Sequence, residues 1–177
     1  LTCALVPPAV SGALVPLFFA TRAIPFPLAD SLFVFRRVEG DTLIHVACRK
    51  NDLCFLSTYA ETFRAQLNVQ NKDGETALHV ACFYKFYEGV EILLEAGADF
   101  KLCNLIGDTP LHSACLIRCV KQRCVKLLLE AGANVNIPNN AKMTPLHLTI
   151  LMRCTKTMKL LLEAGAKIDS QDIHGNT

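Results

Sequence analysis

A nine-residue segment recurs four times in this chain of 177 residues. Its threonines, at positions 42, 76, 109 and 144, are 34, 33 and 35 residues apart. A period between about 20 and 50 residues is typical of repeat proteins, in which each short unit is stable only when neighbours stack on it. The copies read GDTLIHVAC at Gly40–Cys48, GETALHVAC at Gly74–Cys82, GDTPLHSAC at Gly107–Cys115 and KMTPLHLTI at Lys142–Ile150. The chain starts without Met and stops as a fifth copy begins at Gly175, so we expect a fragment of a longer protein.

A second signature, Leu-Leu-Glu-Ala-Gly-Ala, follows three of the copies, at Leu93–Ala98, Leu128–Ala133 and Leu161–Ala166. The next threonine always lies 12 residues after the glycine of this signature. The repeats therefore differ in length only between the threonine of one repeat and the glycine of the same repeat. Leu and Ala recur at helical spacing after three of the four threonines, and Val90 begins the apolar stripe of a second helix. Each unit is therefore predicted to hold two short helices and a hairpin of fixed register.

The Thr-Pro-Leu-His motif, together with a period near 33 residues, resembles the ankyrin repeat. The resemblance covers residues 39–177 and implies an all-α solenoid of stacked helix-turn-helix units with hairpin loops. The chain departs from the pattern at several positions. Arg64 stands where a helix-ending glycine is expected, Lys142 replaces a hairpin glycine, and Thr149-Ile150 replaces Ala-Cys in the fourth repeat. The repeats are placed at about 40–73, 74–106, 107–141 and 142–174, with the start of a fifth at 175.

The most regular positions have structural explanations. A threonine hydroxyl can satisfy unpaired backbone donors at a helix start, and glycine favours the left-handed backbone of a helix end. Successive histidines would lie roughly 10 Å apart, too far to share a metal ion. The resemblance implies that they are hydrogen-bonding struts between hairpin and helix. These positions are Thr42, His45, Thr76, His79, Thr109, His112, Thr144 and His147, with the glycines Gly97, Gly132 and Gly165.

Charge, motifs and cysteines limit the possible functions. The net charge of +2 gives no reason to expect a nucleic-acid partner. No P-loop, dinucleotide fingerprint, Gly-x-Ser-x-Gly or HExxH motif occurs, so we expect no catalysis, cofactor or small-molecule substrate. Nine cysteines, an odd number without a small-domain framework, indicate free thiols in a reducing intracellular compartment, cytoplasmic or nuclear. The spacing of Cys115, Cys119, Cys124 and Cys154 matches no structural zinc pattern, and packing explains these residues.

The first 38 residues differ in character from the repeats. Residues 1–29 hold no acid, one base and five of the eight prolines. The uncharged segment Leu1–Ala20 is long enough to span a bilayer, but Pro8 and Pro16 would each break a helix there. We therefore expect an irregular, apolar, Pro-rich lead-in, and a membrane segment or a gene-boundary artefact remains an alternative.

The second repeat has an unusual surface pattern. Its first helix is followed by Phe83, Tyr84, Phe86 and Tyr87, and its hairpin tip is apolar. Rigidly held aromatic residues are common interface hot spots, although two or more of these residues could instead pack on a neighbouring repeat or on the apolar lead-in. The bases around the helix loops of the third and fourth repeats could steer an acidic partner. The candidate partner-binding residues are Phe83, Tyr84, Leu102, Leu105 and Ile106.

The resemblance implies a non-enzymatic scaffold that binds another protein through hairpin tips and the concave helix surface. Two alternatives stay open. The array could be the substrate-recognition arm of a ubiquitin-ligase adaptor or other multidomain enzyme, or the cytosolic array of a membrane protein. Ankyrin-like arrays are also substrates of an asparaginyl hydroxylase, and the context Leu129–Asn136 makes Asn136 a candidate site.

Overall fold

The computed structural model describes residues 40–60, 62, 64–116 and 122–177. This part of the chain is helical and contains no strand, which confirms the all-α prediction. The predicted lead-in, including Leu1–Ala20, lies outside the described residues. The elements are α2 (Leu43–Lys50), α3 (Leu53–Tyr59), η1 (Arg64–Gln66, a 3₁₀ turn), α4 (Ala77–Phe83), α5 (Tyr87–Glu95), α6 (Pro110–Cys115), α7 (Arg123–Glu130), α8 (Pro145–Leu151) and α9 (Thr155–Glu163).

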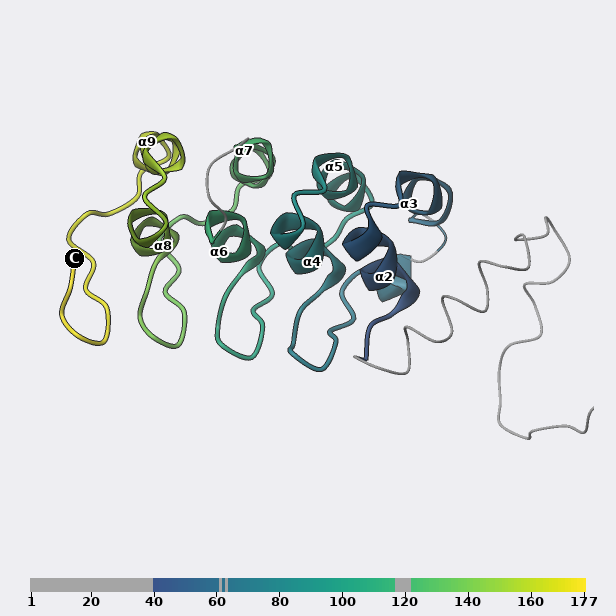
Figure 1. Cartoon of the computed structure of the whole chain (residues 1–177), viewed down its shortest axis with the longest axis horizontal. Helices are drawn as coiled ribbons and strands as arrows, with labels where there is room; N and C mark the ends of the chain where they lie inside the picture. Colours follow the sequence, from purple (N-terminus) through teal and green to yellow (C-terminus); the bar gives the residue numbers. More distant parts are fainter. Residues whose placement is uncertain (1–39, 61, 63, 117–121) are drawn as a thin grey trace, which may run out of the picture.

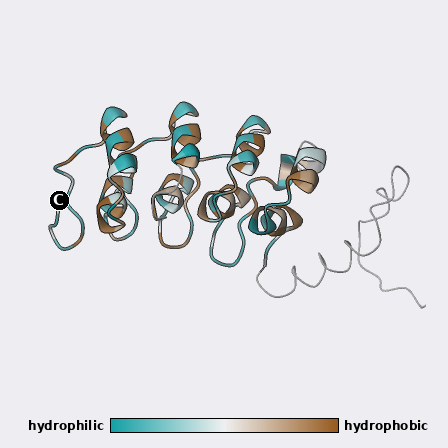
Figure 2. Ribbon diagram, turned by 45° about the horizontal axis from the view of Figure 1, so that its top comes forward, coloured by the Kyte–Doolittle hydropathy of each residue, from teal (hydrophilic) through white to brown (hydrophobic). Residues whose placement is uncertain are grey.

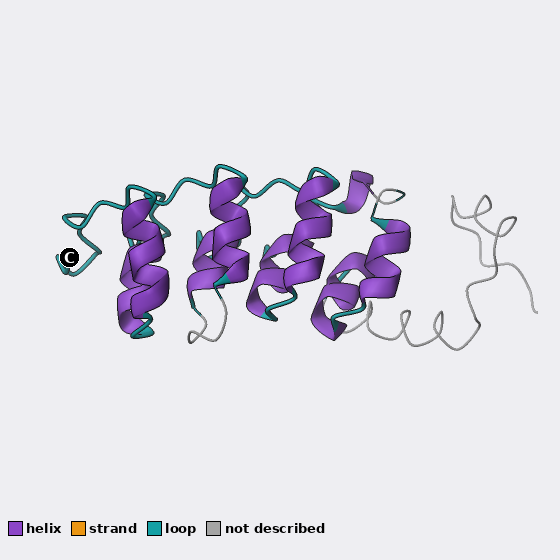
Figure 3. Ribbon diagram, turned by 90° about the horizontal axis from the view of Figure 1, so that it is seen from above, coloured by secondary structure: helices purple, strands orange, loops and turns teal. Residues whose placement is uncertain are grey.

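The helices form four antiparallel pairs stacked side by side (Figures 1 and 3). The first helices of the pairs, α2, α4, α6 and α8, make an inner row, and α3, α5, α7 and α9 make an outer row. Hairpins project from the inner row on the side away from the outer helices (Figure 1). The outer helices α5, α7 and α9 each carry one hydrophobic and one hydrophilic face (Figure 2).

The core is a continuous layer between the two rows of helices. Each inner helix contributes a leucine or isoleucine two residues after its threonine, and each of these side chains is at most 5% exposed. Small residues beside them, such as Ala81, are also buried and let neighbouring helices approach closely. The residues at the leucine position are Ile44, Leu78, Leu111 and Leu146, and the outer helices add Leu56, Leu93, Leu128 and Leu161.

The cysteines of the motif contribute to this core. Cys48, Cys82 and Cys115 occupy one motif position and are at most 1% exposed, and burial raises the thiol pKa of Cys48 and Cys115. Six cysteines of the described part are free thiols. Cys154 is disulfide-bonded, so the expectation of free thiols throughout is wrong there, because sequence spacing does not show which sulfurs meet. Cys119, one of the four weighed for zinc, lies outside the described residues.

Each hairpin is closed by an Asx side chain, and the hairpins bond to one another. Asn71 Oδ1 accepts the backbone N–H groups of Asp73 and Glu75 at 3.0 and 2.9 Å. Between hairpins, the Leu105 N–H donates to the Asp73 carbonyl at 3.0 Å, and equivalent bonds join the two later pairs. The row of tips is thus a hydrogen-bonded edge. Lys142, in place of a hairpin glycine, adopts a left-handed φ of 57°.

Candidate partner-binding surface

The repeated Thr–His pairs connect each repeat to the next. The Thr76 N–H donates to His79 Nδ1 at 3.1 Å, and His79 Nε2 lies 2.9 Å from the Asp108 carbonyl of the following hairpin. His45 reaches the Glu75 carbonyl in the same way, also at 2.9 Å. The structure therefore places each histidine between neighbouring repeats. His112 and His147 make the corresponding contacts to Met143 and Asn176, at 3.2 and 3.3 Å.

This geometry favours neutral imidazole rings. Because Nδ1 accepts a backbone N–H, the ring proton is placed on Nε2, which donates to the carbonyl. Burial lowers the pKa of His79 to about 4, and it also lowers the pKa of His45 and His112. Protonation of Nδ1 would set two donors against each other, so these rings serve as fixed hydrogen-bonding groups.

Glycine ends the outer helices of repeats two to four. Gly97, Gly132 and Gly165 have φ between 86° and 91°, a left-handed backbone that glycine adopts without steric cost. A Cβ at these positions would meet nothing within 4 Å, so conformation rather than space accounts for the glycine. In the first repeat, where Arg64 stands instead, the chain forms the 3₁₀ turn η1.

The five candidate binding residues differ in exposure. Leu105, Ile106 and Phe83 are 69%, 59% and 50% exposed, whereas Leu102 is half-buried. Tyr84 is also exposed, but its hydroxyl accepts a hydrogen bond from Arg49 Nη1 at 2.9 Å. Exposed apolar groups are therefore present both on a hairpin tip and at the end of α4.

The aromatic residues of the second repeat divide between surface and core. Phe86 is 4% exposed, and its ring occupies the space where a side chain on Gly89 would lie. Tyr87 is half-buried and packs against the core. Phe86 and Tyr87 therefore pack within the array, while Phe83 and Tyr84 are exposed.

A polar network that the sequence did not reveal holds Tyr84. Arg49 Nη2 donates to Asp41 Oδ2 at 2.8 Å, and the Arg49 guanidinium lies 5.4 Å from the centre of the Tyr84 ring. Asp41 is 2% exposed and also accepts from Asn71 Nδ2 at 2.9 Å. Tyr84 thus joins the first and second repeats, and a substitution there would disturb the scaffold as well as the surface.

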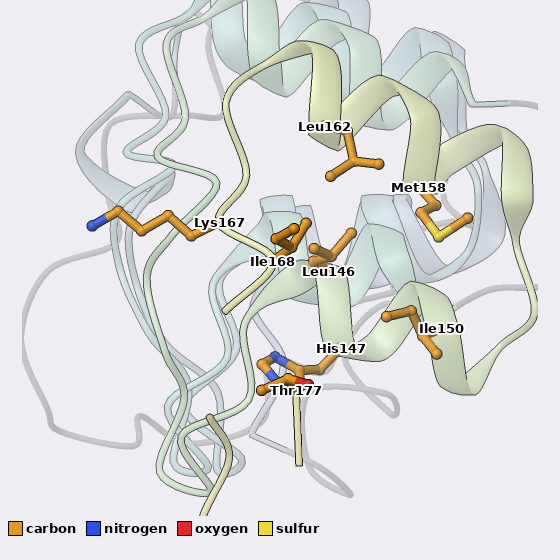
Figure 4. Close-up of a pocket in the computed structure, with 8 residues that line it drawn as sticks. All are labelled: Leu146, His147, Ile150, Met158, Leu162, Lys167, Ile168 and Thr177. Carbon is orange, nitrogen blue, oxygen red and sulfur yellow. The ribbon is translucent and has the colours of Figure 1, made fainter. Parts of the chain in front are cut away.

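The final repeat exposes a second apolar area at the end of the stack. A pocket of about 130 Å³ lies there between α8, α9 and the chain that follows them. Figure 4 shows Leu146, Leu162 and Ile168 pointing toward one another, while the Lys167 ammonium points away. Ile150 is 48% exposed, whereas Cys115, at the same motif position one repeat earlier, is 1% exposed. The lining residues are Leu146, His147, Ile150, Met158, Leu162, Lys167, Ile168 and Thr177.

Asn136 bridges the third and fourth repeats. Its Oδ1 accepts the Lys167 N–H at 2.8 Å, and its Nδ2 donates to the Gly165 carbonyl at 3.1 Å. Both ends of the amide are engaged, so access by a modifying enzyme would require this hairpin to open. Hydroxylation at Asn136 stays a prediction.

Comparisons with known proteins establish the class to which the chain belongs. The sequence pattern of the family described as "Ankyrin repeats (3 copies)" matches two overlapping ranges of this chain, residues 17–104 and 97–172. The chain belongs to the ankyrin-repeat family. Ankyrin repeats are generally modules that bind other proteins and are typically non-enzymatic.

Curated relatives match the chain over about half its length. An ANK repeat-containing protein, nipk-1, from Caenorhabditis elegans is 38% identical over 45% of this chain and 15% of its own length. The target of rapamycin complex 2 subunit AVO2 from Saccharomyces cerevisiae is 30% identical over 52% of the chain and 22% of its own. NF-kappa-B inhibitor alpha from Sus scrofa is 35% identical over 46% of the chain and 27% of its own. The chain thus corresponds to about a quarter or less of these relatives.

The alternative of a membrane segment at Leu1–Ala20 concerns residues that the structure does not describe. Among the residues that it does describe, none of the helices combines the length and the apolar character needed to span a bilayer. The longest of them have nine residues.

Proposed function

We propose that this chain is a non-enzymatic binding module that recognises another protein through two surfaces. These are the tip of the hairpin that carries Leu105 and Ile106, between the second and third repeats, and the end of α4. The observation that supports this proposal most directly is the exposure of Phe83, Leu105 and Ile106, each at least 50%, on a scaffold whose adjacent motif residues are buried. Large apolar side chains held this way gain free energy when a partner covers them.

The scaffold favours recognition because it is already ordered. The hairpin that carries Leu105 and Ile106 bonds to both neighbouring hairpins, through the Leu105 N–H and the Ile106 carbonyl, at 3.0 and 3.1 Å. The end of α4 is held through Tyr84 and Arg49. A partner would therefore bind without a large cost of ordering the surface. Two relatives, by their names, are a subunit of a complex and an inhibitor of another protein, which agrees with this role.

We expect the double substitution Phe83→Ser with Leu105→Ser to abolish partner capture while changing the Tm by less than about 2 °C, because neither side chain belongs to the core. Capture is measured by affinity purification and quantitative mass spectrometry, and the Tm by circular dichroism. Tyr84 is left unchanged because of its bond to Arg49.

The matched control is Leu53→Ser, which removes an apolar side chain that is 44% exposed on the outer helix α3. This variant should capture the same proteins as the unmodified chain. Equal capture by the double variant, or an equal loss of capture in the control, would contradict the assignment of the binding surface.

A further inference from the structure

One position of the inner helices forms an apolar row across three repeats. The residue seven places after the capping threonine is Phe83, Leu116 and Leu151 in the second, third and fourth repeats. Phe83 and Leu151 are 50% and 64% exposed, and Leu116 is partly exposed. These three residues are called the apolar row. In the first repeat the same position holds Arg49, so the row begins at the second repeat.

Basic residues accompany the apolar row. Two places further along the chain, Lys85 and Arg153 lie exposed in the turn between inner and outer helix, with φ of 62° and 54°. In each of the four repeats, the residue at the row position and the two residues after it include no acidic residue. These residues are 49–51, 83–85, 116–118 and 151–153. A partner that lies along the row would therefore be favoured if acidic residues flank its apolar side chains.

The spacing of the row limits the shape of such a partner. The inner helix α6 packs against both α4 and α8, and packed helices have axes about 8 to 10 Å apart. An α-helix rises about 1.5 Å per residue, so side chains seven residues apart on one face are separated by about 10.5 Å. One apolar side chain per repeat thus matches one side chain per seven residues of a helix laid across the array.

We infer that the apolar row binds an amphipathic α-helix of the partner, with apolar residues at every seventh position and acidic residues beside them. This inference rests on the proposed function and specifies the chemistry of its partner. A polyproline II segment, an extended conformation with three residues per turn, could present an apolar side chain at every third residue with nearly the same spacing, about 9 Å. It would, however, place unpaired backbone N–H and C=O groups against apolar side chains, whereas a helix satisfies its own.

Synthetic peptides test this inference on the intact chain. The probe is a fluorescein-labelled 21-residue helical peptide with leucines at positions 4, 11 and 18 and glutamates flanking them. We expect saturable binding in fluorescence anisotropy, weakened at least about tenfold by Phe83→Ser with Leu151→Ser. Leu53→Ser, which alters a side chain 44% exposed on the outer helix α3, should leave binding unchanged. Replacing the glutamates by lysines should weaken binding, and added salt should weaken only the glutamate peptide.

Three outcomes would overturn the inference. The first is that the helical peptide fails to bind. The second is stronger binding by a peptide with leucines five residues apart or by an extended peptide with leucine at every third position. The third is equal binding by the Phe83→Ser, Leu151→Ser variant. A separate result would leave the proposed function intact. If the helical peptide does not bind, but the unmodified chain captures a protein that the Phe83→Ser, Leu105→Ser variant does not capture, only the helical nature of the partner is wrong.

Discussion

Replacing Leu78 by alanine is expected to lower the free energy of unfolding by about 3 to 5 kcal/mol. Leu78 is fully buried in α4, which packs between the neighbouring inner helices α2 and α6. Removing its side chain leaves a cavity at the centre of the stack. Because each repeat depends on its neighbours, the loss should affect the repeats on both sides.

Urea unfolding followed by circular dichroism measures this change, and Leu105→Ala is the control. The Leu105 side chain is 69% exposed, so its truncation should alter the free energy of unfolding by less than about 0.5 kcal/mol. Similar losses in the two variants would mean that Leu78 does not lie in a shared core, and the stacked arrangement would then be wrong.

Acidification from pH 6.5 to pH 4 is expected to destabilise the fold, with about 3 kcal/mol of the loss arising from His79. The buried ring has a pKa of about 4, below its ordinary value of 6.5. Between these values the unfolded chain binds a proton that the folded chain does not, so the free energy of unfolding falls as the pH falls. Above about pH 7.5 this residue contributes almost no pH dependence, because the ring is then neutral in both states.

The contribution of His79 is isolated by comparison with His79→Gln. Urea unfolding of both proteins at pH 7 and pH 4 should show a smaller acid loss in the variant, by about 3 kcal/mol. The comparison cancels the contributions of other titratable groups, because both proteins contain them. One of these groups is Glu75, whose raised pKa increases the free energy of unfolding as the pH falls. An identical acid loss in the two proteins would show that the His79 ring is not buried as a neutral group.

The repeated positions could be predicted from the sequence because their roles are local. The threonines stand at the N-cap positions of the inner helices, and such a position depends only on the next few residues. The carbonyl partner of each histidine could not be predicted, because it belongs to the next repeat. His79, for example, reaches Asp108, 29 residues further along the chain.

The exposure of each aromatic residue in the second repeat could not be predicted from the sequence, for a related reason. Phe83 and Phe86 are three residues apart, yet the first is 50% exposed and the second 4%. α4 ends at Phe83, and the turn that follows directs Phe86 onto Gly89 of α5. The exposure of each residue therefore depends on where one helix ends and the next begins. Gly89, a residue that disfavours helices but lies within α5, is the sequence signal that could have indicated this packing.

Hydrogen exchange of the chain, alone and bound to its captured partner, tests most directly where the partner binds. Binding through the hairpin tip and the end of α4 predicts slower amide exchange in residues 83–86 and 104–107. It also predicts unchanged exchange in the outer helices α5 and α7. Protection confined to those outer helices, with the tip and the end of α4 exchanging as in the free chain, would contradict the account.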